Sequence, residues 1–344
     1  MSLKRFIYRI AAGGLPVFSR FSPRQYVDDI GIIMVHGVYH ETGASGFPTP
    51  RGSILLKDFE ANLLSLTRTY AFLSMDELVE VLIGDTPHRK RSLVLTFDDS
   101  LKCHTEVVAP KLAAWGIPAI FYLSTNTIET RRPYWWLRLE YALSRLAGPV
   151  SVVLPDGQQR TVDSSPDVAV RRNLTTTLRG TGKPAAIEKV VAAIEAEARI
   201  NVQEVNRAYP FSEPMTWDDA RELVRLGMTV GSHTVSHPNL SLLTAEELQS
   251  EFEGSRRVIE RECQTPCRHL CYPHGFYSDA VCDAARQAGY VSGVTADGPG
   301  WNAPGTNLFR LGRFAMPEPP YKLPFMVTGA ENIIGMIRNK MAPA

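Results

Sequence analysis

Two histidines lie four residues apart in the stretch GSHTVSHPNLS, at His233 and His237, and a proline directly follows the second. A residue before proline is driven toward extended backbone, so we expect His237 in a turn and not on a helix face. Imidazole is the commonest metal ligand among protein side chains. The pair is therefore typical of two ligands that need a third, although such a pair taken alone fits a structural role equally well.

Other titratable residues follow apolar runs that indicate buried strands. His36 follows IIMV, Asp98 and Asp99 follow SLVLTF, and His274 follows HLCY with one proline between. In parallel α/β folds, functional residues gather at the carboxyl ends of the strands. The sequence therefore predicts that these side chains and the histidine pair meet at one rim.

The residue types at that rim suit metal-assisted hydrolysis. One aspartate and two histidines, with a coordination position left for water, form a typical catalytic zinc site. Side chains alternate in direction along extended chain, so one of the two aspartates can bind a cation while the other faces the substrate. We predict Asp99 as the third ligand, Asp98 as the base that accepts a proton from water, and His36 as a general acid. Taken singly, an aspartate pair is more often a turn or helix cap, and a lone histidine is more often part of the core.

The elements that would position these residues alternate between short apolar runs and capped helices. This rhythm predicts a parallel sheet, open or closed into a barrel. Ser74 with Glu77 and Thr244 with Glu247 are capping boxes at two helix starts, and Thr216 caps a third helix. The rhythm stops between about residues 128 and 214, where VSVVLPDGQQRTV predicts a hairpin between helices. We interpret this stretch as an α+β insertion between strand–helix units.

Two motifs carry a resemblance to a known family. TFDDS (Thr96 to Ser100) and SHTVSH (Ser232 to His237), the second within MTWDDARELVRLGMTVGSHTVSHPNLSLLTAEEL, resemble the polysaccharide deacetylases, also called the NodB-homology family or carbohydrate esterase family 4. The resemblance implies a distorted (β/α) barrel of seven strands. We expect this barrel over residues 30–127 and 215–320, a helical segment over 1–29, an insertion subdomain over 128–214 and a C-terminal extension over 321–344.

The resemblance also implies roles for single residues. Asp98 becomes the catalytic base, and Asp99, His233 and His237 become the metal ligands. CYPHG resembles the third family motif, in which an arginine stands at the position of Cys271; Arg313, with Arg310 as the alternative, is expected to replace it beside the base. The backbone N–H of His274 matches a position that stabilises the tetrahedral oxyanion. The family's C-terminal histidine motif is missing, because no histidine follows His274 in this sequence. His36 in VHG would then be the acid, as in a permuted branch similar to poly-N-acetylglucosamine deacetylases.

A chain with this resemblance is expected to be a metal-dependent hydrolase that removes an N-acetyl group from an amino sugar. The sugar could belong to a polysaccharide, a glycolipid, or a lipid- or nucleotide-linked saccharide. Zinc suits the predicted ligands, with cobalt and nickel as alternatives. Two other functions stay open: hydrolysis of cyclic amides or ureides, which occurs in the same superfamily, and carbohydrate binding without catalysis. Tyr134, Trp135 and Trp136 either stack on sugar rings or form the buried face of a helix, and we favour the buried face.

The bulk composition limits the partners. With 44% apolar and 21% charged residues, a net charge of +1 and a pI near 7.7, the chain is typical of a globular protein without broad attraction for nucleic acid. We therefore expect no nucleic-acid partner. The first residues combine Lys4 and Arg5 with apolar neighbours, which predicts either an ordinary first helix or peripheral membrane contact. Five cysteines, an odd number, suit a reducing compartment. We expect a cytoplasmic protein, either free in the cytoplasm or peripheral at the inner face of the membrane.

Overall fold

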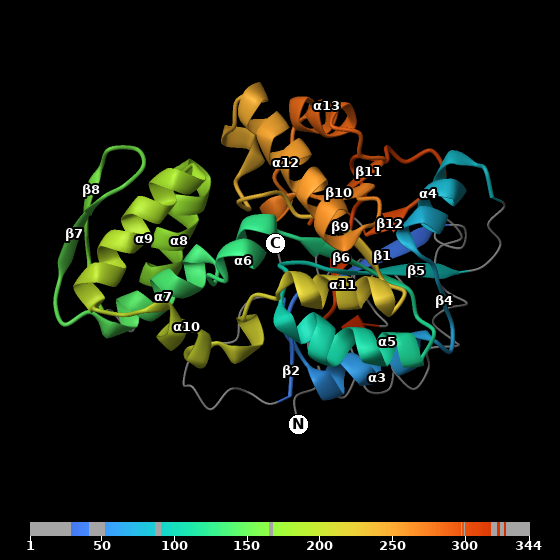
Figure 1. The fold of residues 1–344 in the computed structure, drawn as a ribbon, viewed down its shortest axis with the longest axis horizontal. Helices are drawn as coiled ribbons and strands as arrows, with labels where there is room; N and C mark the ends of the chain where they lie inside the picture. Colours follow the sequence, from blue (N-terminus) through green and yellow to red (C-terminus); the bar gives the residue numbers. More distant parts are fainter. Residues whose placement is uncertain are drawn as a thin grey trace, which may run out of the picture.

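The computed structural model describes residues 29–40, 52–86, 91–164, 168–296, 298, 300–317, 322–323 and 327. Figure 1 shows an α/β barrel with a second lobe at one side, which the insertion forms. The predicted helical segment over residues 1–29, with its membrane contact, and the extension over 321–344 lie almost wholly outside the described residues. Within the described part of the chain, no helix has the length and apolar character that crossing a bilayer requires.

Parallel strands form the barrel in the order β11-β10-β9-β6-β5-β1. In chain order they are β1 (Ile30–Val35), β5 (Ser92–Phe97), β6 (Ala119–Leu123), β9 (Thr229–Ser232), β10 (His269–Cys271) and β11 (Ser292–Val294). Every residue of β5 and β6 is buried, because strands inside an α/β barrel are covered on both faces. This burial explains why SLVLTF and AIFYL are continuous apolar runs without alternation.

The chain after β11 closes the barrel. Leu311 bridges Val294 in parallel, and β13 (Phe314–Ala315) then pairs in parallel with β1. The segment from Leu311 to Ala315 thus takes the seventh strand position, which confirms the predicted distorted (β/α) barrel. Two short strands lie at the amino-terminal end of the barrel strands. β4 (Ala71–Phe72) pairs with the start of β5, and β12 (Trp301–Asn302) pairs antiparallel with the start of β1. A further parallel pair, β2 (Val38–Tyr39) with β3 (Ile54–Leu55), lies outside the barrel sheet.

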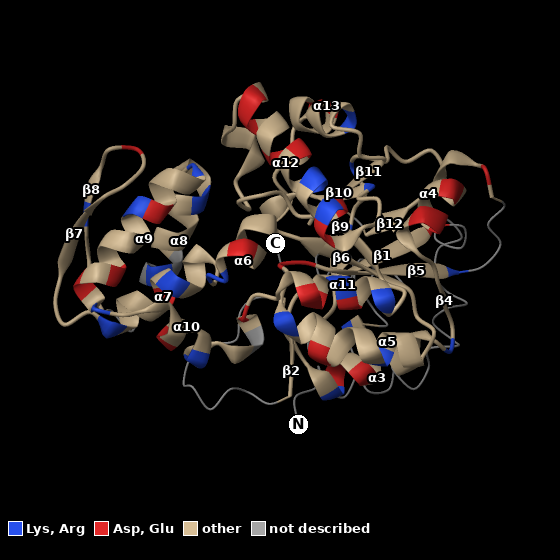
Figure 2. Ribbon diagram, in the orientation of Figure 1, with Lys and Arg blue, Asp and Glu red and all other residues tan. Residues whose placement is uncertain are grey.

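Helices cover the outside of the barrel and carry most of its charged residues (Figure 2). They are α3 (Leu56–Leu66), α4 (Met75–Ile83), α5 (Ala109–Ala114), α11 (Trp217–Arg225), α12 (Ala245–Cys263) and α13 (Asp279–Gln287). The capping boxes predicted at Ser74 and Thr244 are present, and the box at Thr216 is completed by Asp219. Before α5 the chain makes a π-helical turn, His104–Val108. This turn places the His104 ring against Phe97 and Phe121, with centroid distances of 5.5 and 5.4 Å.

The insertion folds as a lobe with its own core. After α6 (Thr125–Thr130) come α7 (Trp135–Arg145), the antiparallel hairpin β7 (Val150–Val153) and β8 (Gln159–Val162), α8 (Val168–Thr181), α9 (Pro184–Ala198) and α10 (Val202–Ala208). Trp135, Leu139 and Val191 belong to an apolar cluster distinct from the barrel core. Arg138 of α7, only 1% exposed, donates to Glu188 and Glu195 of α9 at 2.7–2.9 Å and so fixes α7 against α9.

Candidate active site

The carboxyl ends of β5 and β9 bring the three predicted metal ligands together. Asp99 Oδ1 lies 3.5 Å from Nε2 of His233 and 3.5 Å from Nε2 of His237. All three ligand atoms lie within 4.8 Å of one another. These distances suit three ligands that point at one ion.

The donor set also fits a divalent cation chemically. Asp99 Oδ1 is buried and has no hydrogen-bond partner among the residues that the structure describes. An unsatisfied buried carboxylate oxygen is costly unless it binds a cation. His233 Nδ1–H donates to the carbonyl oxygen of Cys271 at 2.9 Å, which fixes the tautomer and directs Nε2 toward Asp99. One carboxylate and two imidazoles match the protein ligands of a catalytic zinc site.

A second group of residues, Asp98, His233 and Cys271, also converges. It fits a cation less well, because both Asp98 oxygens already accept hydrogen bonds from Arg313. Burial raises the pKa of the Cys271 thiol, which disfavours the thiolate that a metal needs. Cys271 is a free, buried cysteine, as are the other four.

Arg313 holds the predicted base. Its Nη1 and Nη2 donate to Oδ1 and Oδ2 of Asp98, each at 2.8 Å, and both residues are 2% exposed. Nη1 also donates to Thr96 Oγ1 at 3.0 Å, and Nε donates to the carbonyl oxygen of Thr295 at 2.8 Å. Burial raises the pKa of Asp98, but the charge and hydrogen bonds of Arg313 outweigh it, with help from His233 and His36, and hold the pKa at about 2. Asp98 is therefore ionised at neutral pH.

The alternative assignment to Arg310 is wrong. Arg310 is exposed, forms an ion pair with Asp279 and lies over the ring of Tyr277. Arg313 also occupies the space beside Cys271, with Nη2 at 3.1 Å from Sγ. Of these two arginines, Arg310 lies at the surface and Arg313 contacts the base.

His36 lies next to both aspartates. Its Nε2 is 4.0 Å from Asp98 Oδ2 and 4.0 Å from Asp99 Oδ2, and the side chain is 22% exposed. His104 Nε2 donates to the His36 carbonyl oxygen at 2.9 Å, and burial lowers the pKa of His104 to about 4, so this ring stays neutral. His36 is therefore placed where it can exchange a proton with a bound substrate.

Gly52 makes room for His36. Its backbone has φ of +80°, and a Cβ at this position would clash with His36 Nδ1. We expect Gly52→Ala to move the imidazole and lower kcat by about 10- to 100-fold, because small displacements of catalytic groups have effects of this size. Steady-state kinetics would measure this loss, and KM should change little.

Gly84→Ala is the matched control for that substitution. Gly84 has a similar φ of +88°, but a Cβ there meets no atom within 4 Å. Both variants should lose about 1 kcal/mol of stability through backbone strain. Equal kcat values in the two variants would contradict the positioning role of Gly52.

The loop between the two histidines is held by a carboxylate that no sequence motif indicates. Glu251 of α12 accepts hydrogen bonds from the N–H of Val235 at 2.8 Å and from the N–H and hydroxyl of Ser236. His237 lies in a loop and not on a helix face, as predicted, but its φ of +54° is left-handed and not extended. Its N–H donates to Thr234 Oγ1 at 3.1 Å, which stabilises this conformation.

The site concentrates left-handed backbone. Asp99, Ser100, Thr234, His237 and His274 are non-glycine residues with φ between +52° and +79°. Such residues cost free energy and persist where the surroundings fix them, often at functional sites. The predicted ligand and oxyanion positions therefore share an unusual local geometry.

His274 and the insertion aromatics line the side of the site next to His237. The His274 ring lies 4.5 Å from the His237 ring, and its position in the 3-10 turn Pro273–Gly275 has φ of +59°. Tyr134 and Trp135 are 6% and 8% exposed, as expected for a buried helix face. Trp136 is more exposed and packs at 5.2 Å from the His237 ring and 4.3 Å from the Tyr134 ring.

Comparisons with known proteins find relatives of this chain. The family model for polysaccharide deacetylases matches residues 85–293. A chitooligosaccharide deacetylase of Sinorhizobium fredii is 30% identical over 87 residues, which are 25% of this chain and 40% of the relative. YxkH of Bacillus subtilis is 29% identical over 99 residues, 29% of this chain and 35% of its own length. The chain thus spans well under half the length of these curated relatives.

Solved structures show the same fold. The deacetylase PplD of Streptococcus pyogenes, in complex with acetate, has a TM-score of 0.57 at 18% identity, covering 92% of this chain and all of its own. IcaB from Ammonifex degensii has a TM-score of 0.56 at 16% identity, covering 88% of this chain and 97% of its own. At such low identity these similarities concern the fold alone.

Proposed function

This chain belongs to the polysaccharide deacetylase family, and from that premise we propose that it removes the N-acetyl group from an amino sugar with the help of a divalent metal ion. One observation carries the proposal: Asp99, His233 and His237 converge beside an Asp98 carboxylate that Arg313 keeps ionised. A ligand triad next to a separate base is the arrangement that metal-assisted amide hydrolysis requires. Zinc suits these ligands, with cobalt and nickel as alternatives.

Asp99, His233 and His237 would hold the metal, which supplies Lewis-acid polarisation of the acetyl carbonyl and a lower pKa for water. Asp98 accepts the proton of the attacking water through a carboxylate oxygen. Arg313 keeps Asp98 charged and fixes the plane of its carboxylate through two parallel hydrogen bonds. The base is thus oriented before substrate binds.

His36 completes the proton transfer. As the tetrahedral intermediate collapses, His36 donates a proton to the departing amine, and its Nε2 lies 4.0 Å from a carboxylate oxygen of each of the two aspartates. The backbone N–H of His274, held in a left-handed turn, would donate to the oxyanion. Trp136 offers a partly exposed aromatic face next to His237 for the sugar ring.

An acetate-release assay tests the proposal. The full chain is incubated with free, nucleotide-linked and lipid-linked N-acetyl amino sugars, and Asp98→Asn serves as the blank. We expect release from at least one substrate class, loss of release with a chelator, and recovery when zinc is added. Hydrolysis of cyclic imides without acetate release, or saccharide binding without any turnover, would overturn the proposal in favour of the other two functions.

A further inference from the structure

The two histidines of the proposed metal site are oriented in different ways. His233 is oriented by a hydrogen bond, because its Nδ1–H donates to the carbonyl oxygen of Cys271 at 2.9 Å. Nδ1 of His237 is buried and has no hydrogen-bond partner within the described part of the chain. Metal-binding histidines almost always donate this second N–H to a carboxylate, a carbonyl or water. The ring of His237 needs another source of orientation, because the terminal torsion of histidine is otherwise broad.

Aromatic rings surround His237 in place of that hydrogen bond. The ring centroids of Tyr134 and Trp136 lie 5.0 and 5.2 Å from that of His237. The rings of His233 and His274 lie 4.6 and 4.5 Å from it. Tyr134 and Trp136 also stack on each other, with a centroid distance of 4.3 Å and an interplanar angle of 13°. These four rings restrict the rotation of the His237 imidazole.

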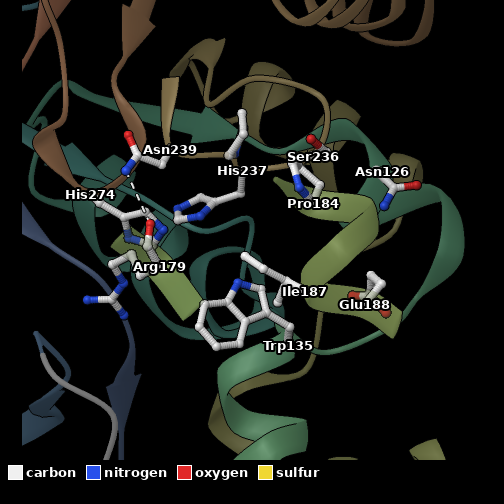
Figure 3. Close-up of a pocket in the computed structure, with 11 residues that line it drawn as sticks. Asn126, Trp135, Arg179, Pro184, Ile187, Glu188, Ser236, His237, Asn239 and His274 are labelled. Carbon is white, nitrogen blue, oxygen red and sulfur yellow. Dashed lines mark hydrogen bonds between the residues drawn. The ribbon is translucent and has the colours of Figure 1, made fainter. Parts of the chain in front are cut away.

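Two of the four rings belong to the insertion. Trp136 lies in the first turn of α7, and Tyr134 directly precedes that helix. Figure 3 shows the region where the two parts of the chain meet, a pocket with His237 on the barrel side and Trp135 of α7 on the insertion side. The insertion therefore forms one wall of the proposed metal site.

Contacts at the base of the insertion hold this wall against the histidine loop. The backbone N–H of Asn126, in α6, donates to the carbonyl oxygen of Val235 at 3.0 Å. Helix α6 leads directly into the insertion. Arg131, at the end of α6, forms an ion pair with Glu213 at 2.8 Å, which joins the beginning of the insertion to its end. The aromatic pair is thus placed beside His237 by contacts that do not involve the cation.

We propose that Tyr134 and Trp136 are positioning residues for His237, and that the insertion thereby sets the affinity of the site for its divalent cation. The inference rests on the proposed metal-dependent function and concerns cation binding, not turnover. A ligand that is already oriented loses less conformational freedom when the cation binds. Groups that orient a metal ligand from outside typically change metal affinity by about 10- to 100-fold.

A zinc titration tests the inference. Competition between the metal-free protein and a chromophoric chelator measures the dissociation constant of zinc without any saccharide, so stacking on a sugar does not contribute. We expect Trp136→Leu and Tyr134→Leu each to weaken zinc binding by about 10- to 100-fold, because leucine is smaller and leaves space in which the imidazole can rotate. Trp136→Phe and Tyr134→Phe keep a ring at each position and should retain most of the affinity.

Leu139→Ala is the matched control for loss of packing in the insertion. Leu139 lies on the same helix, is fully buried and belongs to the apolar cluster of the insertion. Its substitution loosens that cluster but removes no ring beside His237, so the zinc dissociation constant should stay that of the unchanged protein. Denaturant unfolding checks that each variant is folded under the conditions of the titration. Unchanged zinc affinity in both leucine variants overturns the inference, and so does an equal loss in Leu139→Ala.

The acetate-release assay separates this inference from the function on which it rests. Zinc affinity that depends on Trp136, in a protein that releases no acetate from any substrate, counts against the deacetylase function alone. Metal-dependent acetate release, with the same zinc affinity in both leucine variants as in the unchanged protein, counts against the positioning role alone. If the unchanged protein binds neither zinc, cobalt nor nickel, both proposals are wrong.

Discussion

Arg313→Met is expected to lower kcat/KM for acetate release by about 10²- to 10⁴-fold, the range that a positioned general base contributes. Methionine fills similar volume but removes both hydrogen bonds to Asp98 and the positive charge beside it. Burial then prevails and raises the pKa of Asp98, so the base is both misoriented and partly protonated. Kinetics across pH should show the acid limb of the kcat/KM profile at higher pH in the variant.

The same substitution should change stability in a pH-dependent way. In the unchanged protein the pKa of Asp98 is depressed to about 2, so its stabilising contribution is present above the unfolded pKa and is lost as pH falls toward 2. In Arg313→Met the folded pKa of Asp98 is raised above its unfolded pKa. Stability therefore falls as pH rises from the unfolded pKa to the folded pKa. Denaturant unfolding should show a loss of about 3–5 kcal/mol at pH 7 that becomes smaller near pH 4.

Two further variants make the result specific. Arg310→Met removes an exposed arginine that pairs with Asp279 and should retain activity. Arg313→Met with Cys271→Arg returns an arginine from β10, since Cys271 Sγ lies 3.5 Å from Asp98 Oδ2. Recovery of part of the lost activity is expected. An unchanged pH profile in Arg313→Met would contradict the role of Arg313 at the base.

Residues close together in the sequence could be assigned to the site because local patterns position them. The apolar run SLVLTF predicts a buried strand, and its end fixes Asp98 and Asp99 at the barrel rim. The capping boxes at Ser74 and Thr244 fix helix starts through hydrogen bonds over three residues. Such short-range geometry is present in the sequence itself.

Contacts between distant segments could not be predicted in the same way. Glu251 and His104 hold the His237 loop and His36 from separate helices, and neither follows a strand or belongs to a motif. The sequence predicts Arg313 only with Arg310 as an alternative, because nothing local separates two arginines three residues apart. The position of Trp136 beside His237 depends on how the insertion packs against the barrel, which the sequence does not show.

Asp99→Asn is expected to abolish metal-dependent stabilisation and to reduce acetate release by about 10³-fold or more, since Lewis-acid assistance is worth several kcal/mol. Asparagine keeps the size of the side chain but removes the charge between His233 and His237. A cation at 100 times its dissociation constant stabilises the folded protein by about 2.7 kcal/mol. Chelator-treated unchanged protein should therefore show a higher Tm when zinc is added, and Asp99→Asn should show no shift.

Asp76→Asn is the control variant, because it breaks an aspartate–histidine pair that lies outside the proposed metal site. Asp76 Oδ1 lies 3.2 Å from His269 Nε2 at the far end of β10 from the site, so this variant should keep both the zinc-dependent shift and the activity. Cys271→Ser tests the competing donor set of Asp98, His233 and Cys271. If Asp99→Asn kept the full Tm shift while Cys271→Ser lost it, the cation would bind at Asp98. Asp98 would then be the metal ligand and Asp99 the base, the reverse of the roles proposed above.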